Sequence, residues 1–200
     1  MFTINVHADF KPLVDRLNAV KAAAGDKALV SALNKTVAQA QTQMSRAIRE
    51  EFNISAAEVR ERLRVERANR RSGYRFTAAL LGNPEGRRNR SLNVIRFLER
   101  STSLAEAKRR DARGTLEQLH FKIKRRGGKQ IIEGAFIANK GRTVFIREGK
   151  ERLPIKPVQT VGVPQMFNTR RINAPVRRWI ATNFPRIFAA EVRYYLMLTR

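Results

Sequence analysis

Lysine and arginine are the residues whose number and distribution most clearly indicate chemistry in this sequence. The 200 residues include 41 Lys and Arg against 17 Asp and Glu, a formal net charge of +24. Residues 1–66 hold 10 basic and 8 acidic groups, residues 67–130 hold 18 and 5, and residues 131–200 hold 13 and 4. A surplus of this size favours contact with phosphate backbones or with an acidic partner, because such contacts release condensed counterions.

The basic residues of the middle third fall into clusters, of which the last has the spacing of a β-hairpin. Lys122 and Lys124 alternate outward along a strand-like stretch, and Arg125 and Arg126 follow at a turn. Such a hairpin would present its cations to phosphates. No helix-turn-helix, zinc-finger or RRM signature accompanies it, so base-specific reading is not expected. The candidates for non-specific DNA contact are Arg87, Arg88, Arg90, Arg109, Arg110, Arg113, Lys122, Lys124, Arg125, Arg126 and Lys129.

No catalytic constellation is visible in the sequence. It contains no Gly-rich phosphate loop, no G-x-S-x-G motif and no pair of histidines at metal-ligand spacing. His7 and His120 lie opposite the aliphatic residues of two strand-like stretches, where exposed strand histidines are expected. Glu58 and Arg62 stand four apart and are expected to pair on a solvated helix face. The sequence therefore predicts a protein that is not an enzyme and has no cofactor or metal site.

The composition also bears on compartment. Cysteine is absent, which excludes disulfides and thiolate metal sites and is compatible with a reducing cytosol. No stretch approaches the roughly 18–20 apolar residues that span a bilayer, and MFTINVHADF lacks the basic start and long apolar middle of a signal peptide. We expect a soluble protein, used where it is made and without a membrane partner.

Hydrophobic periodicity predicts one α+β domain over residues 1–200. A long amphipathic helix is expected from Asp26, and Ser55 to Glu58 has the pattern of a capping box for a short helix ending near Leu63. Residues 92–98 fit either a strand or a helical turn. Short strands are expected at 2–6 and within 73–82, and the runs at 119–123, 130–138 and 143–148 predict an antiparallel three-stranded meander.

The C-terminal region predicts an aromatic-rich helix. Apolar residues recur every four positions from Val176 to Leu196, and Pro185 is expected to kink or break the helix because proline lacks an N–H. Loops near 83–91 and 101–115 are expected to be mobile or ordered by a partner, since they are rich in charge. The helix aromatics favour a core role over a partner-binding stripe: Trp179, Phe184, Phe188, Tyr194 and Tyr195.

A proline-punctuated apolar segment, residues 147–166, is called here the strap. Its prolines favour extended backbone and remove ladder donors, while its aliphatic side chains supply apolar contact. The strap is expected to pack either across a neighbouring subunit or across its own domain. Its candidate interface residues are Leu153, Pro154, Ile155, Pro157, Val158, Val161, Val163, Pro164 and Met166.

The strap and its flanks carry a resemblance to a known family. The first helix, ALVSALNKTVAQAQTQMSRAIREEFNISAAEVRERL, is followed by a basic strand-rich middle and then by VFIREGKERLPIKPVQTVGVPQMF before an aromatic terminal helix. This arrangement resembles the prophage minor tail protein Z family of long-tailed phages. The most specific parts are FNI after the helix and the strap from Arg147 to Met166.

The resemblance implies a structural virion protein that completes the head-proximal end of the tail, so that the tail can join a DNA-filled head. Similar neck and tail-completion proteins have an α+β fold and form homo-oligomeric rings, commonly six-fold, beside tail terminator, tail tube or neck proteins. The family brings no catalytic residues. It implies a place in the virion tail or neck after assembly in the host cytoplasm. We further hypothesise that the ring surrounds the DNA passage, where the basic middle would face phosphate.

The alternative function is a free, non-specific nucleic-acid-binding protein of the packaging or nucleoid type. A nuclease would need clustered carboxylates or a histidine site, and nothing in the sequence singles out two of the 17 acidic residues.

Overall fold

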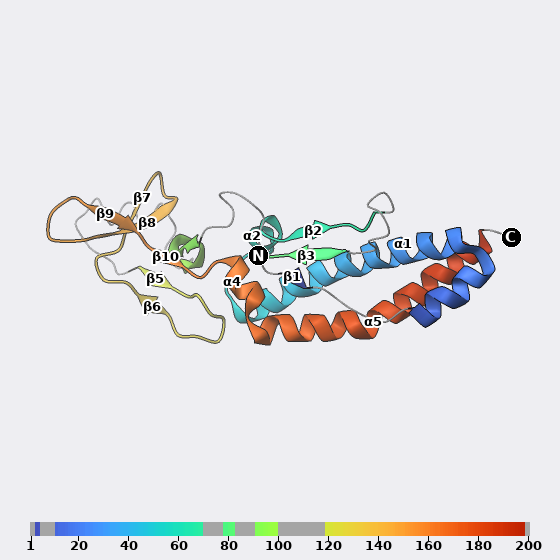
Figure 1. Cartoon of the computed structure of the whole chain (residues 1–200). Coiled ribbons are helices and arrows are strands. Elements are labelled where there is room, and N and C mark those ends of the chain that lie inside the picture. Colours follow the sequence, from blue (N-terminus) through green and yellow to red (C-terminus); the bar gives the residue numbers. More distant parts are fainter. Residues whose placement is uncertain (1–2, 5–10, 70–77, 83–90, 100–118, 199–200) are drawn as a thin grey trace.

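Two long antiparallel helices and several small sheets form an elongated molecule in the computed structural model, which describes residues 3–4, 11–69, 78–82, 91–99 and 119–198 (Figure 1). The helices are α1 (Lys11–Glu51) and α5 (Arg170–Met197). They pack side by side as an antiparallel pair, called here the helical hairpin although the two helices are not consecutive in the chain, and the sheets lie toward the other end of the molecule. The chain thus confirms the α+β class. The remaining elements are β1 (Thr3–Ile4), α2 (Ala56–Glu61), β2 (Arg64–Glu66), β3 (Ala79–Leu81), β4 (Leu92–Asn93), the 3-10 helix η2 (Val94–Phe97), β5 (His120–Phe121), β6 (Gln130–Ile131), β7 (Phe136–Ala138), β8 (Thr143–Arg147), β9 (Ile155–Pro157), β10 (Gln159–Thr160) and α4 (Val163–Asn168).

The helical hairpin is held together by the apolar stripes that the sequence predicts. Val37, Ala40, Met44 and Ile48 of α1 are buried in one cluster with residues of α4 and α5. Nearer the tip, Ala28 and Ala32 leave room for two large rings of α5, Phe184 and Phe188, which stack 6.0 Å apart between centroids. Burying a large apolar side chain stabilises a fold by about 1.5–3 kcal/mol, so these stripes are the main source of helix stability.

Both long helices extend further than expected. The first begins at Lys11 rather than near Asp26, because residues 11–25 are rich in the good helix formers Ala, Leu, Lys and Arg, and Pro12 is tolerated in a first turn. The second runs unbroken through Pro185. Burial of Phe184 and Phe188 on either side compensates for the hydrogen bond that the exposed proline removes.

The capping prediction at Ser55 is correct, and Glu58 pairs with Arg62 as expected, but the pair does not lie on a solvated face. The Ser55 hydroxyl accepts a hydrogen bond from the backbone N–H of Glu58 at 3.2 Å. The Glu58 carboxylate accepts from Arg62 at 2.5 Å and from Arg96 of η2 at 2.6 Å. Side-chain exposure is only 14% for Glu58 and 15% for Arg62, so this pair is not a solvated one. It joins α2 to η2.

Both antiparallel pairings of the predicted meander are present, but the run at 130–138 forms two strands, β6 and β7, that belong to different sheets. Strand β5 pairs with β6, whereas β7 and β8 take β9, part of the strap, as their third strand. Val144 of β8 instead packs its side chain into a buried cluster with Phe121 and Leu119. The run at 119–123 therefore meets β8 through side chains rather than through ladder hydrogen bonds. Two other small sheets have the orders β1-β3-β2 and β10-β4.

Residues 92–98 adopt both of the alternatives that their sequence allows, a short strand followed by a helical turn. Asn93 makes the transition: its Oδ1 accepts from the N–H of Ile95 at 3.1 Å and of Val144 at 2.9 Å. Its Nδ2 donates to the carbonyl of Val144 at 3.1 Å. One amide thus caps η2 and fixes β8 beside it. In the described part of the chain, no helix is both long and apolar enough to cross a membrane.

Candidate nucleic-acid and subunit interfaces

The turn between β5 and β6 presents a compact group of cations. Lys124, Arg125 and Arg126 are exposed, while Lys122 is half-buried. The backbone of the turn is fixed to the end of α1, since the N–H of Arg125 donates to the carbonyl of Glu51 at 2.9 Å. The N–H of Asn53 donates to the carbonyl of Ile123 at 2.8 Å. The backbone that carries these cations is therefore held in a defined position.

The other DNA-facing candidates differ in what the structure shows of them. Lys129 Nζ lies 2.7 Å from Glu99 Oε2, so part of its charge is neutralised within the chain. The remaining candidates lie outside the described residues: Arg87, Arg88, Arg90, Arg109, Arg110 and Arg113. Both expected loops, near 83–91 and 101–115, also fall there almost entirely, with only Ser91 described.

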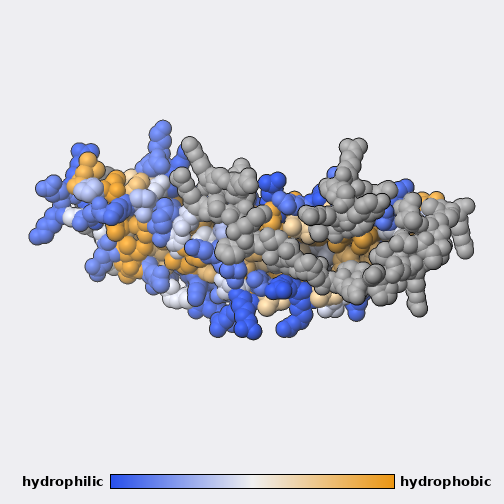
Figure 2. Space-filling view, viewed as in Figure 1, coloured by the Kyte–Doolittle hydropathy of each residue, from blue (hydrophilic) through white to orange (hydrophobic). Residues whose placement is uncertain are grey.

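A second basic surface, which the sequence analysis missed, runs along α5. Arg171, Arg178, Arg186 and Arg193 are all exposed, and the only carboxylate of this helix, Glu191, is buried. We call these four residues the arginine row. In Figure 2, hydrophilic side chains project from the side of the molecule where Figure 1 places α5. Their spacing of seven, eight and seven residues could have revealed this surface in the sequence, because these arginines lie between the apolar residues that recur every four positions.

The second half of the strap packs within its own chain. Val163, Pro164 and Met166 are buried, and Val158 and Val161 are partly buried against the chain's own clusters. Residues 163–168 are helical rather than extended, as α4. Pro164 suits a first helical turn because its φ is preset, and Gln165 Oε1 accepts from the N–H of Gly162 at 2.7 Å.

The first half of the strap, residues 147–157, lies on the surface. Leu153 is 66% exposed, Pro154 and Pro157 are exposed, and Ile155 is half-buried. Ile155 and Pro157 belong to β9, an edge strand whose outer side carries no partner strand among the described residues. Proline is tolerated on such an edge. Figure 2 shows apolar surface bordered by hydrophilic side chains at this end of the molecule.

An aromatic pair lies on the same sheet. Phe136 and Phe145 are opposite each other in the register, with ring centroids 6.2 Å apart, and Pro157 is opposite Phe145 on the next strand. The guanidinium of Arg147 lies 4.7 Å from the Phe136 ring centroid. These residues share one face of the pleat, since side chains alternate along a strand. The first half of the strap therefore borders a half-exposed aromatic face.

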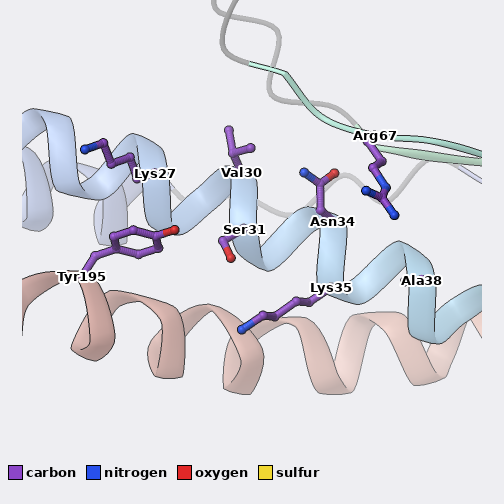
Figure 3. A pocket seen from close by; sticks show the side chains of 8 residues that line it. All are labelled: Lys27, Val30, Ser31, Asn34, Lys35, Ala38, Arg67 and Tyr195. Atoms are coloured by element: carbon purple, nitrogen blue, oxygen red, sulfur yellow. The ribbon is translucent and has the colours of Figure 1, made fainter. Parts of the chain in front are cut away.

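A hollow of about 510 Å³ opens along α1, next to the segment that carries Arg67 and to Tyr195 of α5 (Figure 3). It is lined by Lys27, Val30, Ser31, Asn34, Lys35 and Ala38 of α1, by Arg67 and by Tyr195 of α5. Asn34 positions the segment that carries Arg67, because its amide exchanges two hydrogen bonds, of 2.8 and 3.2 Å, with the backbone of Ala68. The lining includes the cations of Lys27, Lys35 and Arg67, and its Ser31 hydroxyl donates a hydrogen bond to the carboxylate of Glu191.

A buried carboxylate ties the two helices together beside this hollow. Glu191 accepts hydrogen bonds from Lys35 Nζ at 2.5 Å and from the Ser31 hydroxyl at 2.6 Å. Burial acts to raise the pKa of Glu191, but the hydrogen bonds from Lys35 and Ser31 and the lysine charge together hold that pKa below its ordinary value. The same hydrogen bond raises the pKa of Lys35. The cluster is thus an ion pair that stabilises the hairpin.

Among the described residues, no three His, Cys, Asp or Glu side chains gather at one place where they could hold a metal ion. His120 is exposed on β5, as its alternation predicts, while His7 lies outside the described residues. Of the aromatic residues of α5, Phe184 and Phe188 are core, Trp179 and Tyr195 are partly buried, and Tyr194 is 55% exposed.

An elongated α+β structural scaffold with basic and apolar outer surfaces agrees with the tail-protein resemblance, and comparison with known families supports it directly. The chain matches the family described as Prophage minor tail protein Z (GPZ) over residues 10–200. The chain belongs to this family, and is therefore a structural protein of a phage tail. No curated protein and no solved structure matched it.

Proposed function

We propose that this tail protein completes the head-proximal end of the tail as a homo-oligomeric ring, and that the ring joins the tail to the head around the DNA passage. The family supports a structural tail role. The observation that carries the DNA part is the turn of Lys124, Arg125 and Arg126, whose cations are exposed on a backbone hydrogen-bonded to the end of α1. Because the backbone of the turn is already ordered, phosphate contact there costs only the ordering of the three side chains.

The assembly part of the proposal uses the first half of the strap. A ring needs a heterologous interface, in which one patch of each subunit meets a different patch of the next. The open edge of β9, with Leu153 beside it, offers apolar surface and free backbone groups at the end of the molecule away from the helical hairpin. Contacts to terminator, tube or neck proteins could use the same surface. A free packaging or nucleoid factor would also use these cations to bind DNA, but it would not need an edge strand for assembly.

The DNA part is tested with phage particles that carry Lys124→Ser, Arg125→Ser and Arg126→Ser together. We expect normal incorporation into tails, because the three side chains are exposed, but loss of packaged DNA from joined particles. A matched control removes three exposed cations from loops near β7–β9: Lys140→Ser, Arg142→Ser and Lys150→Ser. Equal DNA retention in the turn variant and the control would contradict a DNA-facing turn.

A further inference from the structure

The arginine row of α5 has the geometry of a phosphate-binding track. Seven residues come within about 20° of two full turns of an α-helix, so steps of seven and eight keep Arg171, Arg178, Arg186 and Arg193 near one face. The 22 positions from the first to the last span about 33 Å at 1.5 Å per residue. The row therefore extends over almost the whole length of α5.

The row faces away from the core. Ile172, Val176, Ile180, Phe184 and Phe188 form the buried stripe of α5, and the four arginines are exposed. At 100° per residue, the centre of the buried stripe lies roughly 160° around the helix axis from the centre of the four arginines, so the row is on the side of α5 opposite the stripe. No carboxylate of α5 interrupts the row, because Glu191 is buried against Lys35.

The charges of the row are also available. Within the described part of the chain, none of the four arginines takes part in an ion pair. This contrasts with Arg62 and Arg96, which both bind Glu58. Guanidinium groups without an ion-pair partner among the described residues can each replace a condensed counterion on a phosphate backbone.

The row continues from the cationic turn. Ile123, next to Lys124, packs against the same core cluster that contains Ile172, next to Arg171. In Figure 1 the turn of the β5–β6 hairpin lies at the end of α5 where the helix begins. The turn therefore lies near the N-terminal end of α5, where the row begins.

We propose that the arginine row binds the phosphate backbone of duplex DNA, without base specificity, as a continuation of the turn. Guanidinium groups bind phosphate oxygens through two parallel hydrogen bonds, and a line of them suits a linear polyanion better than a globular acidic protein. The inference rests on the DNA passage of the proposed function, but it can be tested on the purified chain alone.

The test is the salt dependence of binding to a random-sequence DNA duplex, measured by fluorescence anisotropy on the full chain. The row variant carries Arg171→Gln, Arg178→Gln, Arg186→Gln and Arg193→Gln, since Gln keeps helix propensity. Its slope of log affinity against log salt should fall by about 3–4, because each phosphate contact contributes about 0.9. The loss of affinity between about 50 and 200 mM salt then becomes roughly 100-fold smaller.

The matched control removes the same charge elsewhere: Lys140→Gln, Arg142→Gln, Lys150→Gln and Arg152→Gln are all exposed residues near β7–β9. Its slope should change by less than about 1. A second variant with Lys at all four row positions should restore most of the wild-type slope, and circular dichroism should show all variants folded. The inference is overturned if the row variant and the control lose equal slope, or if the row variant binds DNA like wild type.

The two proposals fail separately. A row variant that binds DNA normally but fails to enter tails would contradict the row inference and indicate an acidic protein partner instead. A row that binds DNA as proposed, in a subunit found away from the head-proximal end of the tail, would leave the inference standing and contradict the proposed function.

Discussion

At the scale of single residues, Glu191 is the ionisable group with the clearest structural role. It is 6% exposed and receives hydrogen bonds from Lys35 and Ser31 across the helical hairpin. Glu191→Gln keeps the shape but removes the charge, so the free energy of unfolding should fall by about 1–2 kcal/mol at neutral pH. Urea unfolding measures this directly.

The same variant has a defined pH dependence. The pKa of Glu191 is lower in the folded chain than its ordinary value, so the ionised carboxylate stabilises the fold above the ordinary pKa. That contribution is lost as the pH falls through the lower, folded pKa. The stability difference between wild type and Glu191→Gln should therefore disappear in acid, and a difference that persists or grows there would contradict the ion-pair account.

Gly82 provides a second residue-scale prediction. A Cβ at this buried position would lie 2.6 Å from Cγ of Phe167, which is 1% exposed and cannot move freely. Gly82→Ala should lower stability by about 1–3 kcal/mol through overpacking. Gly128→Ala is the control, because nothing lies within 4 Å of its added methyl group. Thermal unfolding of both variants should separate them clearly, and equal midpoints would count against the packing described.

At the scale of elements, the strap divides into a buried half and a surface half. Met166→Ala should lower the free energy of unfolding by about 2–5 kcal/mol, since this side chain is fully buried in the cluster shared by α1, α4 and α5.

Leu153→Asp with Ile155→Asp should leave the isolated chain folded, because Leu153 is 66% exposed and Ile155 half-buried. The double variant should instead fail to oligomerise or to enter tails, as measured by sedimentation and by tail composition. Normal assembly would sink the intersubunit role of β9.

The sequence predicts the elements whose signals are local. The four-residue spacing of Val176, Ile180 and Phe184 correctly predicts the buried face of α5, because helix periodicity depends only on neighbours along the chain. The pairing of β9 with β8 was missed although only residues 148–154 separate the two strands, because the prolines of the strap argue against a ladder strand. The helical turn of α4 was missed because its prolines favour an extended reading, although Pro164 at its start is equally compatible with a helix.

The basic surfaces were also predictable only where their signal is local in the sequence. Alternation placed the cations of the β5–β6 turn on the surface, where the structure shows Lys124, Arg125 and Arg126. It could not show that Lys129 pairs with Glu99, a residue 30 positions earlier. The arginine row was overlooked because arginines spaced seven or eight apart form no cluster in the sequence, and they come together only on a helix.

At the scale of the whole molecule, the proposed contact surfaces lie at different places along the long axis. The arginine row lies on α5, and the cationic turn lies near the first residues of this helix (Figure 1). The edge strand β9 lies further along the molecule, at the end opposite to the C-terminus of α5. A subunit that presents apolar edge and basic surface at separate places can contact a neighbour and DNA at the same time. This arrangement is compatible with the ring that we propose for this structural tail protein.

The most direct measurement is an averaged electron cryo-microscopy image of intact particles in which this subunit carries a compact label. The account predicts label density as a closed ring at the junction between head and tail, with α5 and the β5–β6 turn facing the DNA passage. Label density along the tail tube, at the distal end of the tail, or only on free DNA would contradict it.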